Sequence, residues 1–265
     1  MNELRARDPL LFWTGALMLL TLVVVTLLSI SDQRLILGIN PWIKPMKFLV
    51  SITIFLWTIG WLMPETEPDP VRRALVRWTV AMAMVIEILL IITQAARGTT
   101  SHFNAATPFD LAVFNIMGAA ITVSSIAVVL LLWTLRRDTP AHRAGYLWGI
   151  RLGVALFIVA SMLPGFLMVA NNAHSFPGPD GGAGLPFVNW TVEKGDVRTA
   201  HFFGMHAMQA LPILGFLLDR TLGSNRASDW IPSARNVVMS AGILWFVVTA
   251  ALLTIALAGR PIMAL

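Results

Sequence analysis

The sequence contains no cysteine, and only 12% of its 265 residues are charged. Without cysteine the chain has no disulfide scaffold, no thiolate metal site and no thiol nucleophile. It also lacks an H-E-x-x-H metal motif, and its last apolar segment has no lysine, which excludes a retinal Schiff base there. The formal charge of +5 does not indicate nucleic-acid binding, because the basic residues are spread over loops rather than gathered in a patch.

Hydrophobic residues are abundant instead, at 57% of the chain, and the mean hydropathy is +0.74. A soluble domain of this length needs more polar residues to cover its surface. Seven apolar segments are each long enough for the roughly 20 residues that a bilayer-spanning helix requires. We predict an all-α integral membrane protein that forms a single transmembrane domain, 1–265, as a seven-helix bundle. The segments are 10–31, 41–63, 75–96, 108–134, 146–170, 197–218 and 234–258, with a long loop at 171–195.

The first apolar segment, 10–31, is too long for a cleaved signal core and is not followed by a small-residue cleavage pattern. We therefore interpret it as a retained helix. The distribution of lysine and arginine over the short loops predicts the orientation of the bundle. With a cytoplasmic N-terminus, 12 of the 19 basic residues lie inside and 7 outside. The cytoplasmic set is Arg5, Arg7, Arg72, Arg73, Arg77, Arg136, Arg137, Arg143, Arg151, Arg220, Arg226 and Arg235.

In this topology the second, fourth and sixth helices begin on the outer side, and each has a start signal. Asn40-Pro41 and Thr107-Pro108 place a capping side chain before a proline, and Gly195-Asp196 precedes the sixth segment. The N-termini of helices carry unpaired N–H groups and a partial positive charge. The outer ends of these helices are therefore predicted to favour an anion.

Four basic residues lie at the same outer level. Lys44 and Lys47 share one face of the second helix, Arg97 closes the third helix, and Arg198 opens the sixth. We predict that these cations hold a carboxylate, a phosphate or a lipid head group. The alternative is that the lysines only extend to phosphates of the outer leaflet.

The third segment carries two polar residues on one face, Glu87 and Gln94, which are seven apart. Glu87 is the only acidic residue well inside any span, and a charge at that depth is costly. We therefore expect Glu87 either to carry a proton or to pair with Lys47. A purely structural hydrogen bond or ion pair between helices is the alternative interpretation.

The sixth segment carries His201 and His206, which are five apart and so project about 140° from each other on a regular helix. One metal ion is therefore not expected to take both. His206 shares a face with Gln209 and lies deeper, so we predict that His206 is the central residue of the site. Gly204, between the two histidines, would let another backbone or a flat cofactor approach closely.

A third histidine, His102, follows the third segment at the same predicted outer level as His201. We expect the third and sixth helices to bring His102 together with a histidine of the sixth helix. The candidate catalytic residues are His206, His102, Glu87 and His201. The three histidines are also the candidate metal ligands, whereas Lys44, Lys47, Gln94, Arg97, Arg198 and Gln209 are the candidate ligand-binding residues.

These residues favour a membrane-embedded enzyme or redox protein of a prokaryotic plasma membrane. Its outward-opening pocket would bind an anionic or amphiphilic ligand, such as a lipid or a quinone, with histidines as general acid or base. The sequence leaves open whether haem or a zinc, iron or copper ion is bound. The alternative is a transporter, channel or receptor in which Glu87 and Lys47 line an ion or proton path.

Reporter fusions test the predicted orientation. A fusion at residue 265 should report an external location, and fusions at residues 138 and 224 should report a cytoplasmic one, because the excess of arginine is retained inside. A cytoplasmic C-terminus would contradict both the orientation and the outer placement of the anion site.

Overall fold

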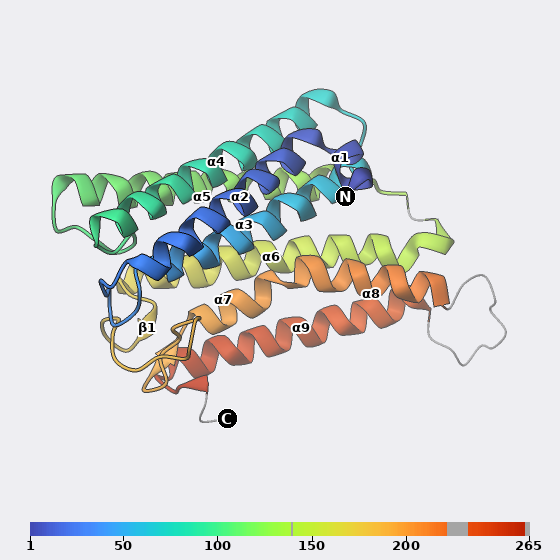
Figure 1. The fold of residues 1–265 in the computed structure, drawn as a ribbon. Helices are drawn as coiled ribbons and strands as arrows, with labels where there is room; N and C mark the ends of the chain where they lie inside the picture. Colours follow the sequence, from blue (N-terminus) through green and yellow to red (C-terminus); the bar gives the residue numbers. More distant parts are fainter. Residues whose placement is uncertain (139, 222–232, 263–265) are drawn as a thin grey trace. The chain divides into compact units, whose positions relative to one another are not determined.

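The computed structural model describes residues 1–138, 140–221 and 233–262, and these residues are mostly helical (Figure 1). Within them seven helices are long and apolar enough to cross a membrane, which is consistent with the predicted all-α membrane protein. The α-helices are α1 Asn2–Arg7, α2 Pro9–Ser31, α3 Ile43–Leu62, α4 Pro70–Arg97, α5 Pro108–Thr134, α6 Ala144–Asn171, α7 Arg198–Met205, α8 Ala207–Thr221 and α9 Ala234–Leu257. Short 3₁₀ turns lie at η1 Met63–Glu65 and η2 Ala141–Arg143, and β1 Ser175–Phe176 pairs antiparallel with β2 Gly195–Asp196.

Helix starts explain where the observed bounds differ from those predicted. α4 begins five residues earlier than expected, because the Asp69 side chain accepts hydrogen bonds from the N–H groups of Val71 and Arg72. The predicted cap at Asn40 is wrong, since α3 begins only at Ile43. The Asn40 Oδ1 accepts instead from the N–H of Trp42, which makes a turn ahead of the helix.

The described chain packs as two compact units. Unit 1 comprises residues 1–131 and 180–189, and unit 2 comprises residues 132–179 and 190–265, apart from the residues outside the described ranges. That both units belong to one transmembrane domain stays a prediction, as does the orientation of the termini. Arg226 and the fusion sites at 224 and 265 lie outside the described residues.

Unit 1 is built on α2, α3 and α4, with α5 packed against α4. Ile91 of α4 and Val113 and Met117 of α5 form a buried cluster that also contacts Phe48 of α3. These helices are apolar on their outer faces as well as inside. Exposed apolar side chains of this number are costly in water but suit contact with lipid chains.

Unit 2 is held together by close approach of α6 and α8. Gly145, Gly149 and Gly153 recur every four residues on the face of α6 that contacts α8. A Cβ atom on Gly149 would lie 2.4 Å from the carbonyl oxygen of Leu211, so only glycine permits this contact. At the end of the pair, the Asp219 carboxylate accepts from two N–H groups in the first turn of α6, those of Gly145 and Tyr146.

The sixth predicted span is not one regular helix, because it breaks at His206 into α7 and α8. The His206 N–H donates to the carbonyl of Phe203, three residues back, rather than to Phe202, four residues back. Pro212 inside α8 removes another helical donor, the one that would reach the Met208 carbonyl. The span therefore contains two departures from regular hydrogen bonding.

Substitution of Gly149 tests the packing of α6 on α8. Gly149→Ala should lower the melting temperature of the detergent-solubilised protein, because the added methyl group overlaps a backbone carbonyl. Overpacking of this kind costs about 1–3 kcal/mol. Gly165→Ala in the same helix is the control, since nothing lies within 4 Å of a Cβ there. Equal melting temperatures for the two variants would contradict the proposed contact.

Candidate functional site

Glu87, in the middle of α4, is a buried ionisable group of unit 1. Its side chain is only 2% exposed. Its Oε1 lies 3.8 Å from Nε2 of His102, and its Oε2 has no hydrogen-bond partner among the described residues. A buried carboxyl group with an unmet oxygen is costly, which marks the position as a site where a proton or a ligand group can bind.

His102 has polar neighbours on both sides of its ring. Its Nδ1 lies 3.1 Å from Oγ of Ser101, and its Nε2 faces Glu87. The side chains of Phe48, Phe103 and Phe114 surround the ring, with centroids 5.9 to 6.4 Å away. Inside this aromatic enclosure the imidazole of His102 thus lies between the hydroxyl of Ser101, at hydrogen-bond distance, and the carboxyl group of Glu87, at 3.8 Å. Because Ser101 is only 3% exposed, this arrangement suits proton relay better than nucleophilic attack by the hydroxyl.

The loop that carries His102 is fixed by its own hydrogen bonds. It begins at Gly98, whose positive φ of 73° ends α4 in the left-handed conformation. The Asn104 amide donates to Oγ1 of Thr99 and to the carbonyl of Thr100, which folds the loop back on itself. It ends at Thr107, whose Oγ1 accepts from the N–H of Asp110 and so caps α5, as predicted.

Gln94 and Arg97 are both committed to Asp110 of α5. The Gln94 Nε2 donates to Asp110 Oδ1 at 2.8 Å, and Arg97 Nη1 forms an ion pair with the same oxygen at 2.5 Å. Arg97 also donates to Oε1 of Gln94. Asp110 is 3% exposed, and its contacts with Gln94 and Arg97 join α4 to α5. The carboxylate of Asp110 therefore offsets the charge of Arg97 that was expected to hold an anion.

The two lysines of α3 serve different partners. Lys44 is the cation that acts electrostatically on the carboxyl group of Glu87, and its Nζ lies 5.9 Å from the ring centroid of Phe48. Lys47, whose pairing with Glu87 was one of two expectations, donates from Nζ to the carbonyl of Val188 at 2.9 Å. It thereby holds the segment 180–189 to unit 1.

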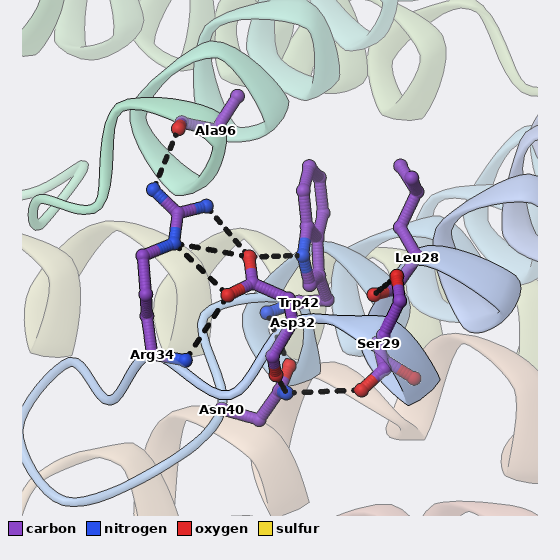
Figure 2. A network of polar contacts seen from close by, with 8 residues as sticks. Leu28, Ser29, Asp32, Arg34, Asn40, Trp42 and Ala96 are labelled. Carbon is purple, nitrogen blue, oxygen red and sulfur yellow. Dashed lines mark hydrogen bonds and ion pairs between the residues drawn. The ribbon is translucent and has the colours of Figure 1, made fainter.

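A second polar network joins the ends of α2, α3 and α4 (Figure 2). The Asp32 carboxylate accepts from the guanidinium of Arg34 and from the indole N–H of Trp42. Arg34 also donates from Nη1 to the carbonyl of Ala96 in the last turn of α4, at 3.0 Å. A cation at a helix C-terminus is stabilised by the helix dipole. This network therefore fixes the start of the His102 loop.

In unit 2 the predicted residues lie on α7, at the α7–α8 break and, for Gln209, on α8. Arg198 forms an ion pair with the buried Asp196 at 2.6 Å. His201 Nδ1 lies 2.7 Å from the carbonyl oxygen of Ala160, and His206 Nδ1 lies 2.6 Å from that of Phe202. The space beside Gly204 is filled by side chains of Ala160 and Thr249. Gly204 thus allows close packing of side chains within unit 2.

The structure brings Lys44, Glu87 and His102 together in unit 1. His201 and His206 belong to unit 2, so a shared site with His102 stays a prediction. The central role of His206 and the ligand contact of Gln209 likewise stay predictions. In the part of the chain that the structure describes, no group of three or more His, Cys, Asp or Glu side chains has the spacing of a metal site. The hypothesis of a metal ion held by three such side chains therefore gains no support from the described residues, and the haem hypothesis stays a prediction.

Sequence reasoning missed two members of this site. Asp110 was not among the predicted site residues, although it is an acidic residue in the first turn of the segment that follows Gln94 and Arg97. Ser101 precedes His102 directly, and a neighbouring hydroxyl was a readable signal for an imidazole partner. No family model, no curated protein and no solved structure matches this chain.

The Asp32 network gives a prediction for acid pH. Hydrogen bonds and charge from Arg34 hold the pKa of Asp32 below its ordinary value, and the same contact raises the pKa of Arg34. A depressed carboxyl pKa stabilises the fold above its unfolded value of about 3.9, and this contribution is lost as the pH falls further. Asp32→Asn should therefore lower the melting temperature most at pH 6, and its difference from the wild type should shrink progressively as the pH falls below about 3.9 toward the depressed pKa of the folded state. A difference that grows on acidification would contradict this.

Proposed function

We propose that this chain is a prokaryotic plasma-membrane protein in which Glu87 and His102 exchange a proton with a bound anionic or amphiphilic ligand. It would act as a membrane-embedded enzyme or redox protein. The observation that carries the proposal is the buried Glu87 carboxyl group, with one oxygen facing His102 and the other without a hydrogen-bond partner. Acid–base groups held in this way contribute roughly 10²–10⁴-fold to the rates of enzymes that use them.

Lys44 supports the anionic character of the ligand. It lies on α3 beside Phe48, and its charge acts on the Glu87 carboxyl group. When Glu87 is neutral, its carboxyl group no longer offsets the charge of the Lys44 ammonium group. That ammonium group is then suited to bind a carboxylate or a phosphate. The phenylalanines around His102 would contact the apolar part of the same molecule.

Proton or ion transport is the second candidate function, and one observation favours it. Glu87 lies within a helix that is long and apolar enough to span the membrane, where an ionisable group commonly marks a proton path. A transporter moves protons across sealed liposomes, whereas an enzyme or redox protein exchanges them only with its ligand. A pH-sensitive dye inside proteoliposomes distinguishes the two candidates.

Glu87→Gln tests the proton-exchanging role directly. The amide keeps the shape of the carboxyl group but cannot release a proton, so proton exchange should be lost while the protein still elutes as a folded species. Infrared spectra of the reconstituted protein, recorded over a pH series, should lose one titrating carboxyl band. Glu193→Gln, in an exposed loop, is the matched control and should retain that band. An unchanged infrared titration in Glu87→Gln would contradict the proposal.

His102→Asn tests the relay. The variant keeps a hydrogen-bonding side chain but removes the imidazole between Ser101 and Glu87. We expect the Glu87 band to remain and its exchange with D₂O to slow by at least about tenfold, because the path for the proton is interrupted. Exchange at the wild-type rate would show that the proton reaches Glu87 by another route.

A further inference from the structure

Both histidines of the sixth span contact backbone carbonyl groups that have lost their usual helical hydrogen bond because the backbone there is irregular. Pro164 in α6 has no N–H, so the carbonyl of Ala160, four residues earlier, lacks its helical donor. The Nδ1 atom of His201 contacts that carbonyl oxygen. At the α7–α8 break the carbonyl of Phe202 loses the N–H of His206 and gains the imidazole of the same residue. In a membrane such released carbonyls need replacement donors.

These contacts define where each imidazole carries its proton. A carbonyl oxygen only accepts, so Nδ1 must donate, and the neutral ring then has a bare lone pair on Nε2. Nε2 of His206 has no hydrogen-bond partner among the described residues. The ring is partly exposed rather than buried. It therefore offers a hydrogen-bond acceptor at the surface of an apolar helix.

Two aromatic rings frame this acceptor. The ring of Phe202 lies 4.2 Å from that of His206, and the ring of Trp190 lies 5.5 Å from Phe202 in an edge-to-face arrangement. Phe202 is 47% exposed, so its surface is open to a ligand. Rings arranged in this way pack well against another flat ring.

An apolar hollow of about 380 Å³ lies between α8 and α9, lined in part by residues that neighbour His206 in sequence. Phe203 and Ala210, three residues before and four after His206, line one side of it, and Leu244 and Trp245 line the other. The Trp245 ring stacks on Phe203 at 4.5 Å and donates its N–H to the Phe203 carbonyl, which makes this wall rigid. The volume falls in the range of small-molecule sites, and its lining suits an alkyl or isoprenoid tail.

We propose that the α7–α8 break is a binding site for a quinol, meaning a flat hydroxylated ring with an apolar tail. Its hydroxyl donates to Nε2 of His206, its ring packs against Phe202 and Trp190, and its tail lies in the hollow beside Trp245. The site lies wholly in unit 2 and does not rest on the function proposed for Glu87 and His102.

Paired ligands test the hydrogen bond. A benzoquinol with a decyl tail and its dimethyl ether have the same ring and tail, but only the first can donate. The full-length protein in detergent should bind the quinol about tenfold more tightly, because the ether leaves Nε2 unpaired. Equal affinities would overturn the proposal. Decanol binding as tightly as the quinol would overturn the role of the aromatic frame.

His206→Phe keeps an aromatic ring and removes the acceptor, so it should abolish the preference for the quinol. His142→Asn, at an exposed histidine of η2, is the control and should keep that preference. A folded His206→Phe protein that still prefers the quinol tenfold would refute the assignment. If His206→Phe does not fold, Trp190→Leu provides the test. It should weaken the binding of both the quinol and its dimethyl ether severalfold and leave the ratio of their affinities unchanged.

Nitrogen-15 spectra of histidine provide a readout that needs no variant at the site. The His206 signals should show a protonated Nδ1 and a bare Nε2, and the quinol should shift the Nε2 signal while the dimethyl ether does not. A proton on Nε2 in the free protein, or no shift with saturating quinol, would contradict the proposal.

Discussion

Polar groups inside an apolar bundle must find partners within the protein, and this requirement governs the arrangement of both units. Hydrocarbon offers no hydrogen bonds, so each released carbonyl or buried carboxyl group has to be met by a neighbour. Ala160 and Phe202 have carbonyls met by histidines, and Asp110 is met by Gln94 and Arg97. Glu87 departs from this rule, since one of its oxygens has no hydrogen-bond partner in the described residues. A departure in an otherwise well-partnered interior is where chemistry is expected.

Close packing between helices follows from the same environment. Lipid chains are as apolar as leucine side chains, so helices gain little from burying bulky residues and associate instead through near contact of their backbones. The four-residue recurrence of Gly145, Gly149 and Gly153 allows α8 to approach α6 in this way. The approach also brings α7 against Ala160, where His201 reaches the carbonyl that Pro164 has released. Backbone irregularity is therefore tolerated where a tightly packed neighbour can supply the missing donor.

The spans were predictable because hydropathy responds to length and composition alone. α5 has the predicted bounds, and α2 and α9 differ from theirs by one residue at one end. The true start of α3 was not readable, since Asn40 followed by proline is a good cap by composition and only the tertiary contacts of Asn40 show another use. The break at His206 was hidden because Gly204 and Pro212 both occur in unbroken membrane helices. The partner of Lys47 lies 141 residues away, a separation that no local pattern reports.

The histidines differ in which nitrogen remains available, and that difference separates their chemistry. Both nitrogens of His102 have polar neighbours, Ser101 on one side and Glu87 on the other, so a proton can enter the ring at one nitrogen and leave at the other. His206 has one nitrogen committed to a carbonyl that cannot return a proton, so its ring is suited to accept a hydrogen bond and hold a ligand in place. Under the two proposals, the same residue type serves proton relay in unit 1 and ligand recognition in unit 2. In each proposal the role of the ring follows from the group that faces Nδ1. For His102 this group is a hydroxyl, which both donates and accepts, and for His206 it is a carbonyl, which only accepts.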